Sequence, residues 1–192
     1  MLSGLQMRLL APFVGALAFA AAACSEPAGP GVPDTGSVLF EIEYVNFAWT
    51  PTWLGAYVDA EGQVFAFDRG GRPWQGDEHP TAGQLAEKYA AGRRLVRSVG
   101  PGEAAGKAAL ISAASRGTLS ERRGACADAG TVRFSAMVYD AAAGRYTRVL
   151  LHLHGDVAQT NYAPEARELY LWLRTLPDVP MLPGGACDPF GG

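Results

Sequence analysis

Alternating apolar and polar positions predict strands in residues 38–68. Residues 38–47 carry an apolar side chain at every second position, and Glu41 and Glu43 fall on the opposite face. Residues 53–58 and 63–68 continue the extended pattern. The four residues between these two segments run from an aspartate to a glycine, as hairpin turns do. We therefore expect a three-stranded antiparallel meander in this region.

After the meander, the apolar residues are no longer spaced two apart but three or four apart, as in a helix. Thr81 and Gln84 match the capping box that opens many helices, and Leu85 and Tyr89 follow at a spacing of four. These positions predict a helix over residues 81–91.

The second half of the chain predicts two more helices and a second hairpin. Alanine-rich sequence indicates a helix within residues 102–115. Residues 131–139 and 146–154 are predicted to form a pair of strands joined by a turn that ends in glycine. A stripe of leucines with a tryptophan then predicts a helix over residues 164–175 that packs on the core.

The expected elements run β-β-β-α-α-β-β-α along the chain. Because strands and helices do not alternate, this order favours an α+β fold. We expect an antiparallel sheet of about five strands with the helices packed on one face. We assign residues 38–192 to a single domain of this kind, since the chain has the length of one domain.

Residues 1–23 match a secretory signal peptide. Arg8 is the one charged residue among them, and a short apolar run follows it and ends in small residues. This run is shorter than the roughly 20 residues that a transmembrane helix needs, and no basic residues follow it.

Cys24 directly follows three alanines. In these residues the chain resembles bacterial lipoproteins, whose signals end in small residues before an invariant cysteine. The resemblance implies cleavage before Cys24 and lipid attachment to its sulfur, with acyl chains such as palmitate as the contact with the membrane. By analogy with lipoprotein sorting, Ser25 favours the outer membrane. The alternative is ordinary signal-peptidase cleavage with Cys24 incidental.

Residues 24–37 are predicted to be a tether between the lipid and the domain. Their prolines and glycines exclude a helix or a central strand. Residues 38–192 resemble only small envelope lipoproteins, and that resemblance implies no activity.

Composition and charge narrow the function classes. The chain is 48% hydrophobic and 18% charged, with a formal net charge of −3. These values exclude a disordered chain and argue against a nucleic-acid binder that depends on bulk positive charge. A phosphate-binding glycine motif is absent from the sequence, so we expect no nucleotide partner. A local group of arginines could face lipid phosphate or an acidic partner, or could form a solvated face: Arg93, Arg94, Arg97, Arg116, Arg122 and Arg123.

Two further cysteines are expected to form a structural disulfide. Cys126 and Cys187 are an isolated pair in a chain that we expect to be exported. A redox pair is the alternative, but redox cysteines usually lie close together as C-x-x-C, and these two do not.

The histidines supply the strongest candidate for chemistry. His152, His154 and Asp156 fall on one face of a predicted strand, and His79 could supply a third imidazole to a metal. The string resembles the start of the metallo-β-lactamase motif, but Val157 stands where that motif has a histidine, so we reject the family. The alternative is a pair of histidines on a solvated or helix-covered strand face, and we expect no cofactor.

Aromatic and acidic side chains supply two weaker candidates. Trp49 and Trp53 flank a short loop and could form a binding patch for a glycan or a protein, or could fold over the sheet edge as core. Glu41 and Glu43 could act as paired carboxylates of a glycosidase, although a strand with one charged face is commonplace.

The sequence therefore favours a membrane-tethered, non-enzymatic domain that binds or supports a component of the cell envelope. It lacks the common motifs of nucleophilic and metal-dependent catalysis. One alternative is a small metal-dependent or acid–base hydrolase that uses His152, His154 and Asp156. Another is an inhibitor or immunity-type lipoprotein.

Overall fold

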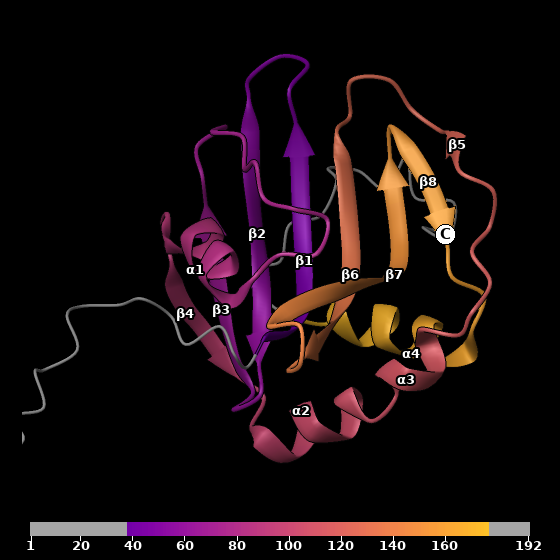
Figure 1. Ribbon diagram of the computed structural model, residues 1–192. Helices are drawn as coiled ribbons and strands as arrows, with labels where there is room; N and C mark the ends of the chain where they lie inside the picture. Colours follow the sequence, from indigo (N-terminus) through magenta and orange to yellow (C-terminus); the bar gives the residue numbers. More distant parts are fainter. Residues whose placement is uncertain (1–37, 177–192) are drawn as a thin grey trace, which may run out of the picture.

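The structure is a computed structural model, which describes residues 38–176 (Figure 1). The strands are β1 (Val38–Asn46), β2 (Thr52–Asp59), β3 (Gln63–Asp68), β4 (Arg94–Ser98), β5 (Arg123–Gly124), β6 (Thr131–Asp140), β7 (Arg145–Gly155) and β8 (Val157–Thr160). The helices are α1 (Ala82–Ala90), α2 (Pro101–Ala108), α3 (Ile111–Ala114) and α4 (Pro164–Leu173). All strand pairs are antiparallel, and the strand order is β4-β3-β2-β1-β6-β7-β8-β5.

The strands of the two predicted hairpin regions are present. β1, β2 and β3 form the meander, and β6 and β7 form the second hairpin. The turn between β2 and β3 is closed by the Asp59 carboxylate, which accepts a hydrogen bond from the Gln63 backbone N–H at 2.7 Å. Gly62 in this turn has a φ of +75°, and a Cβ atom there would lie 2.3 Å from the Gly100 carbonyl oxygen, so only glycine fits.

The expected sheet of about five strands is wrong, because the sheet has eight strands. The missed strands are β4, β5 and β8, which are short and lie at or near the two edges of the sheet. With two to five residues each, these strands have almost no room for the alternation that identifies a half-buried strand, and β4 is exposed along most of its length. Leu95 in β4, for example, is exposed. The single helix predicted within residues 102–115 is divided into α2 and α3.

Helices cover both faces of the sheet, which corrects the expectation that they pack on one face. Behind the sheet in Figure 1, α4 packs on a core that includes Phe40 and Phe134. In front of it, α1 inserts Leu85 and Tyr89 into a second core. Each strand of the meander and of the second hairpin therefore contributes alternate residues to two cores. Within residues 38–176, none of the helices combines the length and apolarity that crossing a membrane requires.

The capping box predicted at the start of α1 is confirmed. Gln84 donates its backbone N–H to the Thr81 hydroxyl at 3.2 Å, and its side-chain oxygen accepts from the Thr81 backbone N–H at 2.8 Å. This arrangement satisfies backbone donors that the first helical turn leaves open. It also determines where α1 begins, and hence where Lys88 lies over the sheet.

Candidate functional site

A group of buried charged side chains lies between α1 and the sheet. We call Glu41, Glu43, Lys88 and Arg148 the buried charge cluster. The exposed fraction is 0% for Lys88, 1% for Glu41 and 3% for Glu43. Lys88 forms ion pairs with both carboxylates, at 2.7 Å in the case of Glu43. The prediction that Glu41 and Glu43 share a strand face is confirmed, but that face is buried rather than solvated.

Each carboxylate of the cluster has further partners. Glu41 accepts a hydrogen bond from Arg148 Nη2 at 3.0 Å and another from the Tyr89 hydroxyl at 3.2 Å. Glu43 accepts from Trp53 Nε1 at 2.7 Å. Because buried charges are costly unless they are paired, this set of partners explains how two carboxylates remain under α1.

The cluster keeps Glu41 ionised. Burial alone would raise the pKa of this carboxyl, but the positive charges and hydrogen bonds of Lys88 and Arg148 outweigh burial and lower the pKa from 4.5 to about 2. The same burial, together with the nearby charge of Glu41, raises the pKa of the Tyr89 hydroxyl well above its ordinary value. A carboxylate with such a low pKa is a poor general acid or base near neutral pH.

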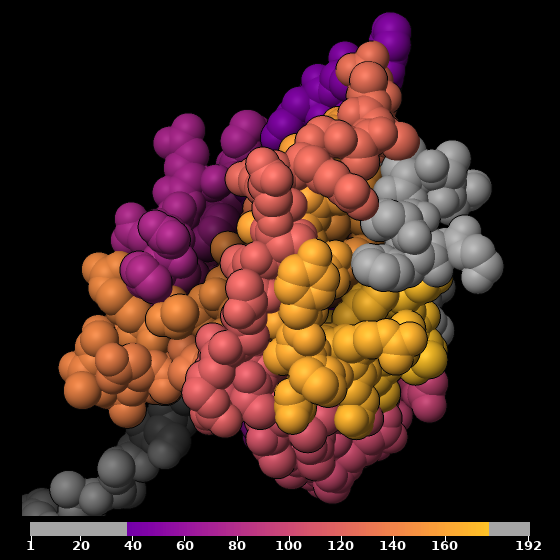
Figure 2. All heavy atoms as spheres, turned by 90° about the vertical axis from the view of Figure 1, so that its right-hand side faces the viewer, coloured from indigo at the N-terminus to yellow at the C-terminus, as the bar shows by residue number. Residues whose placement is uncertain are grey.

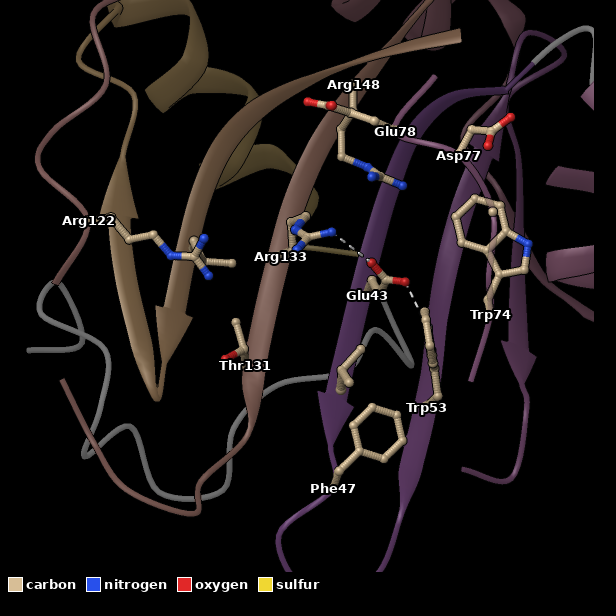
Figure 3. Close-up of a pocket in the computed structure, with 13 residues that line it drawn as sticks. Glu43, Phe47, Trp53, Trp74, Asp77, Glu78, Arg122, Thr131, Arg133 and Arg148 are labelled. Atoms are coloured by element: carbon tan, nitrogen blue, oxygen red, sulfur yellow. Dashed lines mark hydrogen bonds and ion pairs between the residues drawn. The ribbon is translucent and has the colours of Figure 1, made fainter. Parts of the chain in front are cut away.

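A cleft of about 400 Å³ opens on the sheet face beside the cluster (Figure 3). It is lined by Glu43, Val45, Phe47, Trp53, Trp74, Gly76, Asp77, Glu78, Arg122, Thr131, Arg133, Arg148 and Leu153. Residues from β1, β2, β6 and β7 form its floor. The loop that precedes α1 forms one wall, and Arg122 from the segment before β5 forms the other.

Three arginines line one half of this cleft. Arg133 lies opposite Glu43 in the register of β1 and β6, and its Nη1 is 3.4 Å from the Glu43 carboxylate. Arg148 lies on the next strand, and its Nε is buried without a hydrogen-bond partner among the described residues. Arg122 is exposed and makes no ion pair with another residue of the range 38–176. An adjoining hollow of about 360 Å³ is lined by the same three arginines.

Aromatic rings line the other half of the cleft. Trp53 and Phe47 meet edge to face, with ring centroids 6.1 Å apart. The ring of Trp74 lies on the opposite side of Trp53 from Glu43 in Figure 3. Its centroid is 4.8 Å from Lys88 Nζ, a distance at which an ammonium group is attracted to an aromatic face. The cleft therefore presents cations and aromatic rings side by side.

The charges around the cleft nearly balance. Its arginines and Lys88 face Glu41, Glu43 and Glu78, and Asp77 is paired with Arg145 at 3.1 Å. The donation from Arg145 lowers the pKa of the Asp77 carboxyl. Glu43 and Asp77 thus each have a cationic partner. Within residues 38–176, Arg122 has no anionic partner, and Arg133 has one only at its Nη1. The arginine half keeps hydrogen-bond donors available to a ligand.

The structure separates the two predicted tryptophans. Trp49 is 79% exposed at the tip of the β1–β2 hairpin, which projects at the top of Figure 2. Trp53 is half-buried, packs against the core under α1 and lines the cleft. Trp53 therefore serves partly as core, as the alternative interpretation expected of both indoles, whereas Trp49 does not.

His152 and His154 are 1% exposed and lie under α4. The ring centroid of His152 is 4.3 Å from that of Tyr170, and Thr160 Oγ1 is 3.2 Å from its Nδ1. His154 stacks on Phe134. Both rings thus occupy a helix-covered strand face, which is the alternative that the sequence left open.

His79 and Asp156 do not join these histidines. His79 is exposed near Thr147 and lines the hollow on the opposite face of the sheet. The Asp156 carboxylate accepts hydrogen bonds from the backbone N–H groups of Ala129 and Gly130 at 2.8 and 3.1 Å. Among residues 38–176, no three His, Cys, Asp or Glu side chains are grouped so as to hold a metal ion. The geometry gives no support to a metal-dependent hydrolase.

The cysteine predictions fall largely outside the described residues. Cys24 and Cys187 both lie there. Cys126 lies before β6, where its backbone N–H donates to the Gly155 carbonyl at 3.2 Å. The Cys126–Cys187 disulfide and the lipidation of Cys24 stay predictions.

Sequence reasoning missed most of the cleft. Trp53, Glu41, Glu43 and, within the local group of arginines, Arg122 were noted, but Lys88, Arg133 and Arg148 were not. Arg133 lies between the apolar residues Val132 and Phe134 of β6, and an arginine at such a position was the available signal. No family model, curated protein or solved structure matches this chain.

Proposed function

We propose that this protein is a membrane-tethered envelope lipoprotein whose domain binds a ligand without catalysis. The observation that carries the binding role is the cleft, where arginines with available donors adjoin aromatic rings on the α1 face of the sheet. Small-molecule sites commonly combine an apolar lining with a few fixed polar groups in a volume of roughly 300–1,000 Å³.

Membrane attachment is proposed to depend on Cys24. We expect the full chain, expressed in a bacterium fed an alkyne-labelled fatty acid, to incorporate the label and to sediment with membranes. The Cys24→Ser variant should lose the label and appear in the soluble fraction, because it lacks the sulfur that carries the lipid. The Cys126→Ser variant is the matched control and should keep the label. A labelled Cys24→Ser variant would contradict lipidation at this residue.

Ligand binding in the cleft can be measured with the full chain in mild detergent. The protein contains four tryptophans, and nitrogen-15 labelling gives one indole signal for each. Glycan, peptide and lipid fractions of a bacterial envelope are added in turn. We expect at least one fraction to shift the signals of Trp53 and Trp74 while that of Trp172, on the opposite face, stays unchanged. Binding in the cleft is refuted if no fraction produces this pattern.

A further inference from the structure

From the arrangement of charges and rings, we infer that the cleft binds an acidic saccharide, a sugar ring that carries a carboxylate. This inference rests on the proposed binding function and specifies its ligand. It starts from Arg122 and Arg133, which come from different segments and line both the cleft and the adjoining hollow. In Figure 3 the Arg133 guanidinium points toward Glu43, and Arg122 extends from the left toward the strand that carries Arg133. An oxyanion bound in the cleft would accept charge-assisted hydrogen bonds from these guanidinium groups.

Both arginines have side-chain N–H groups that make no ion pair within residues 38–176. The only ion pair of Arg133 within residues 38–176 is the 3.4 Å contact with Glu43, and its side chain is 38% exposed. Arg122 is exposed and carries no ion pair in the same range. Arginine presents paired N–H groups in a plane, a geometry that matches a carboxylate. The arginine half of the cleft therefore suits a planar oxyanion.

The aromatic half supplies a surface for the rest of the ligand. Phe47, Trp53 and Trp74 line the cleft beside the arginines, with Glu43 between Arg133 and Trp53. Sugar rings present apolar C–H faces that pack on aromatic rings, and hydroxyl groups that can donate to a carboxylate. Glu43 is held in place by Trp53 and Lys88, so its position is fixed before a ligand arrives.

A saccharide fits this cleft better than a peptide strand does. Peptides commonly add to the open edge of a sheet, where main-chain groups are unpaired. The cleft lies on the face of β1 and β6, and each of these strands is paired on both sides. Its hydrogen-bonding groups are therefore side chains, and its volume suits a compact ring.

Calorimetry with the full chain in mild detergent tests the inference with four probes. The first is tetragalacturonate, an oligomer of an acidic sugar, and the second is the same oligomer with its carboxylates reduced to alcohols. A tetraglutamate peptide and inorganic phosphate are the third and fourth. We expect tetragalacturonate to bind most tightly, at least tenfold more tightly than its reduced form, and more weakly as salt is raised.

Variants link that binding to the arginines. Arg122→Gln and Arg133→Gln should each weaken tetragalacturonate binding by about fivefold, as expected for the loss of one partly exposed charge pair. Arg97→Gln, on β4 outside the cleft, is the matched control and should bind as the unchanged protein does. Circular dichroism confirms that each variant is folded. Arg122 makes no ion pair within residues 38–176, so its replacement should leave the fold intact.

Four results would overturn the inference. They are equal binding of the reduced oligomer, tighter binding of phosphate or of the peptide, unchanged affinity in both cleft variants, and no binding of tetragalacturonate. These results leave the proposed function standing if an envelope fraction still shifts the Trp53 and Trp74 signals. Failure of the ligand class and failure of the binding function are therefore distinguishable.

Discussion

Glu41 shows how single residues determine the energetics of this domain. Its carboxylate is 1% exposed and is bound by Lys88, Arg148 and the Tyr89 hydroxyl. Because the charges and hydrogen bonds of Lys88 and Arg148 favour the ionised form, the pKa falls from 4.5 to about 2 despite burial. An ionised group with a lowered pKa stabilises the fold above pH 4.5, and this stabilisation is lost as the pH falls toward 2.

We predict that Glu41→Gln removes this contribution. The variant should lose roughly 3 kcal/mol in its free energy of unfolding at pH 7, the value that corresponds to the shift in pKa. Its stability should also change less than that of the unchanged protein as the pH falls from about 5 to about 2. Urea denaturation followed by circular dichroism at several pH values measures both effects.

Glu87→Gln serves as the control for this experiment. Glu87 is an exposed neighbour of Lys88 on α1, so its replacement should leave the stability and its pH dependence nearly unchanged. If Glu41→Gln were as stable as the unchanged protein at pH 7, the buried charge cluster would not stabilise the fold as described.

At the scale of elements, α1 places Lys88 over the sheet. The helix begins at the capping box of Thr81 and Gln84, and its buried side carries Leu85, Lys88 and Tyr89 onto the face that holds the acidic pair. The start of the helix thus determines which of its residues reach the sheet. Sequence predicted this helix and its cap, because capping depends on residues that are neighbours along the chain.

We predict that Thr81→Ala destabilises the domain by about 1 kcal/mol, the usual contribution of an N-cap side chain. The backbone N–H of Gln84 would lose its acceptor. Thermal unfolding should therefore begin at a lower temperature, and amide exchange in the first turn of α1 should accelerate. Thr50→Ala, in the exposed β1–β2 loop, is a suitable control. Equal stability of both variants would show that the cap is dispensable.

At the scale of the whole molecule, the sheet brings distant segments into one site. Antiparallel pairing of β1 with β6 sets Glu43 opposite Arg133, and pairing of β6 with β7 adds Arg148. The loop before α1 and the segment before β5 then complete the cleft. Because these contacts join residues far apart in the chain, no local sequence pattern predicts them.

We predict that a Cys126–Cys187 disulfide ties the end of the chain to the segment before β6. Peptide mapping by mass spectrometry without reductant should recover the two cysteines as one linked peptide. Its removal should lower the free energy of unfolding by about 4 kcal/mol, because the bond would close a loop of about 60 residues in the unfolded chain.

Cys126→Ser and Cys187→Ser should lose the same stability, and the double variant should lose no more than either. The unchanged protein in reductant should match them. A larger loss in one single variant, or a linked peptide that contains Cys24, would contradict the predicted pairing.

Sequence alone determined the features that depend on neighbouring residues. The alternation in β1, β2, β3, β6 and β7, the cap of α1 and the apolar stripe of α4 are local, so their elements were predictable. The short strands β4, β5 and β8, at or next to the edges of the sheet, lack such a pattern, and the predicted number of strands was therefore wrong. Only the tertiary structure decided that helices cover both faces and that His152 and His154 lie apart from His79. It also decided that Lys88, Arg133 and Arg148 meet the acidic pair, since strand register and helix placement are set by long-range packing.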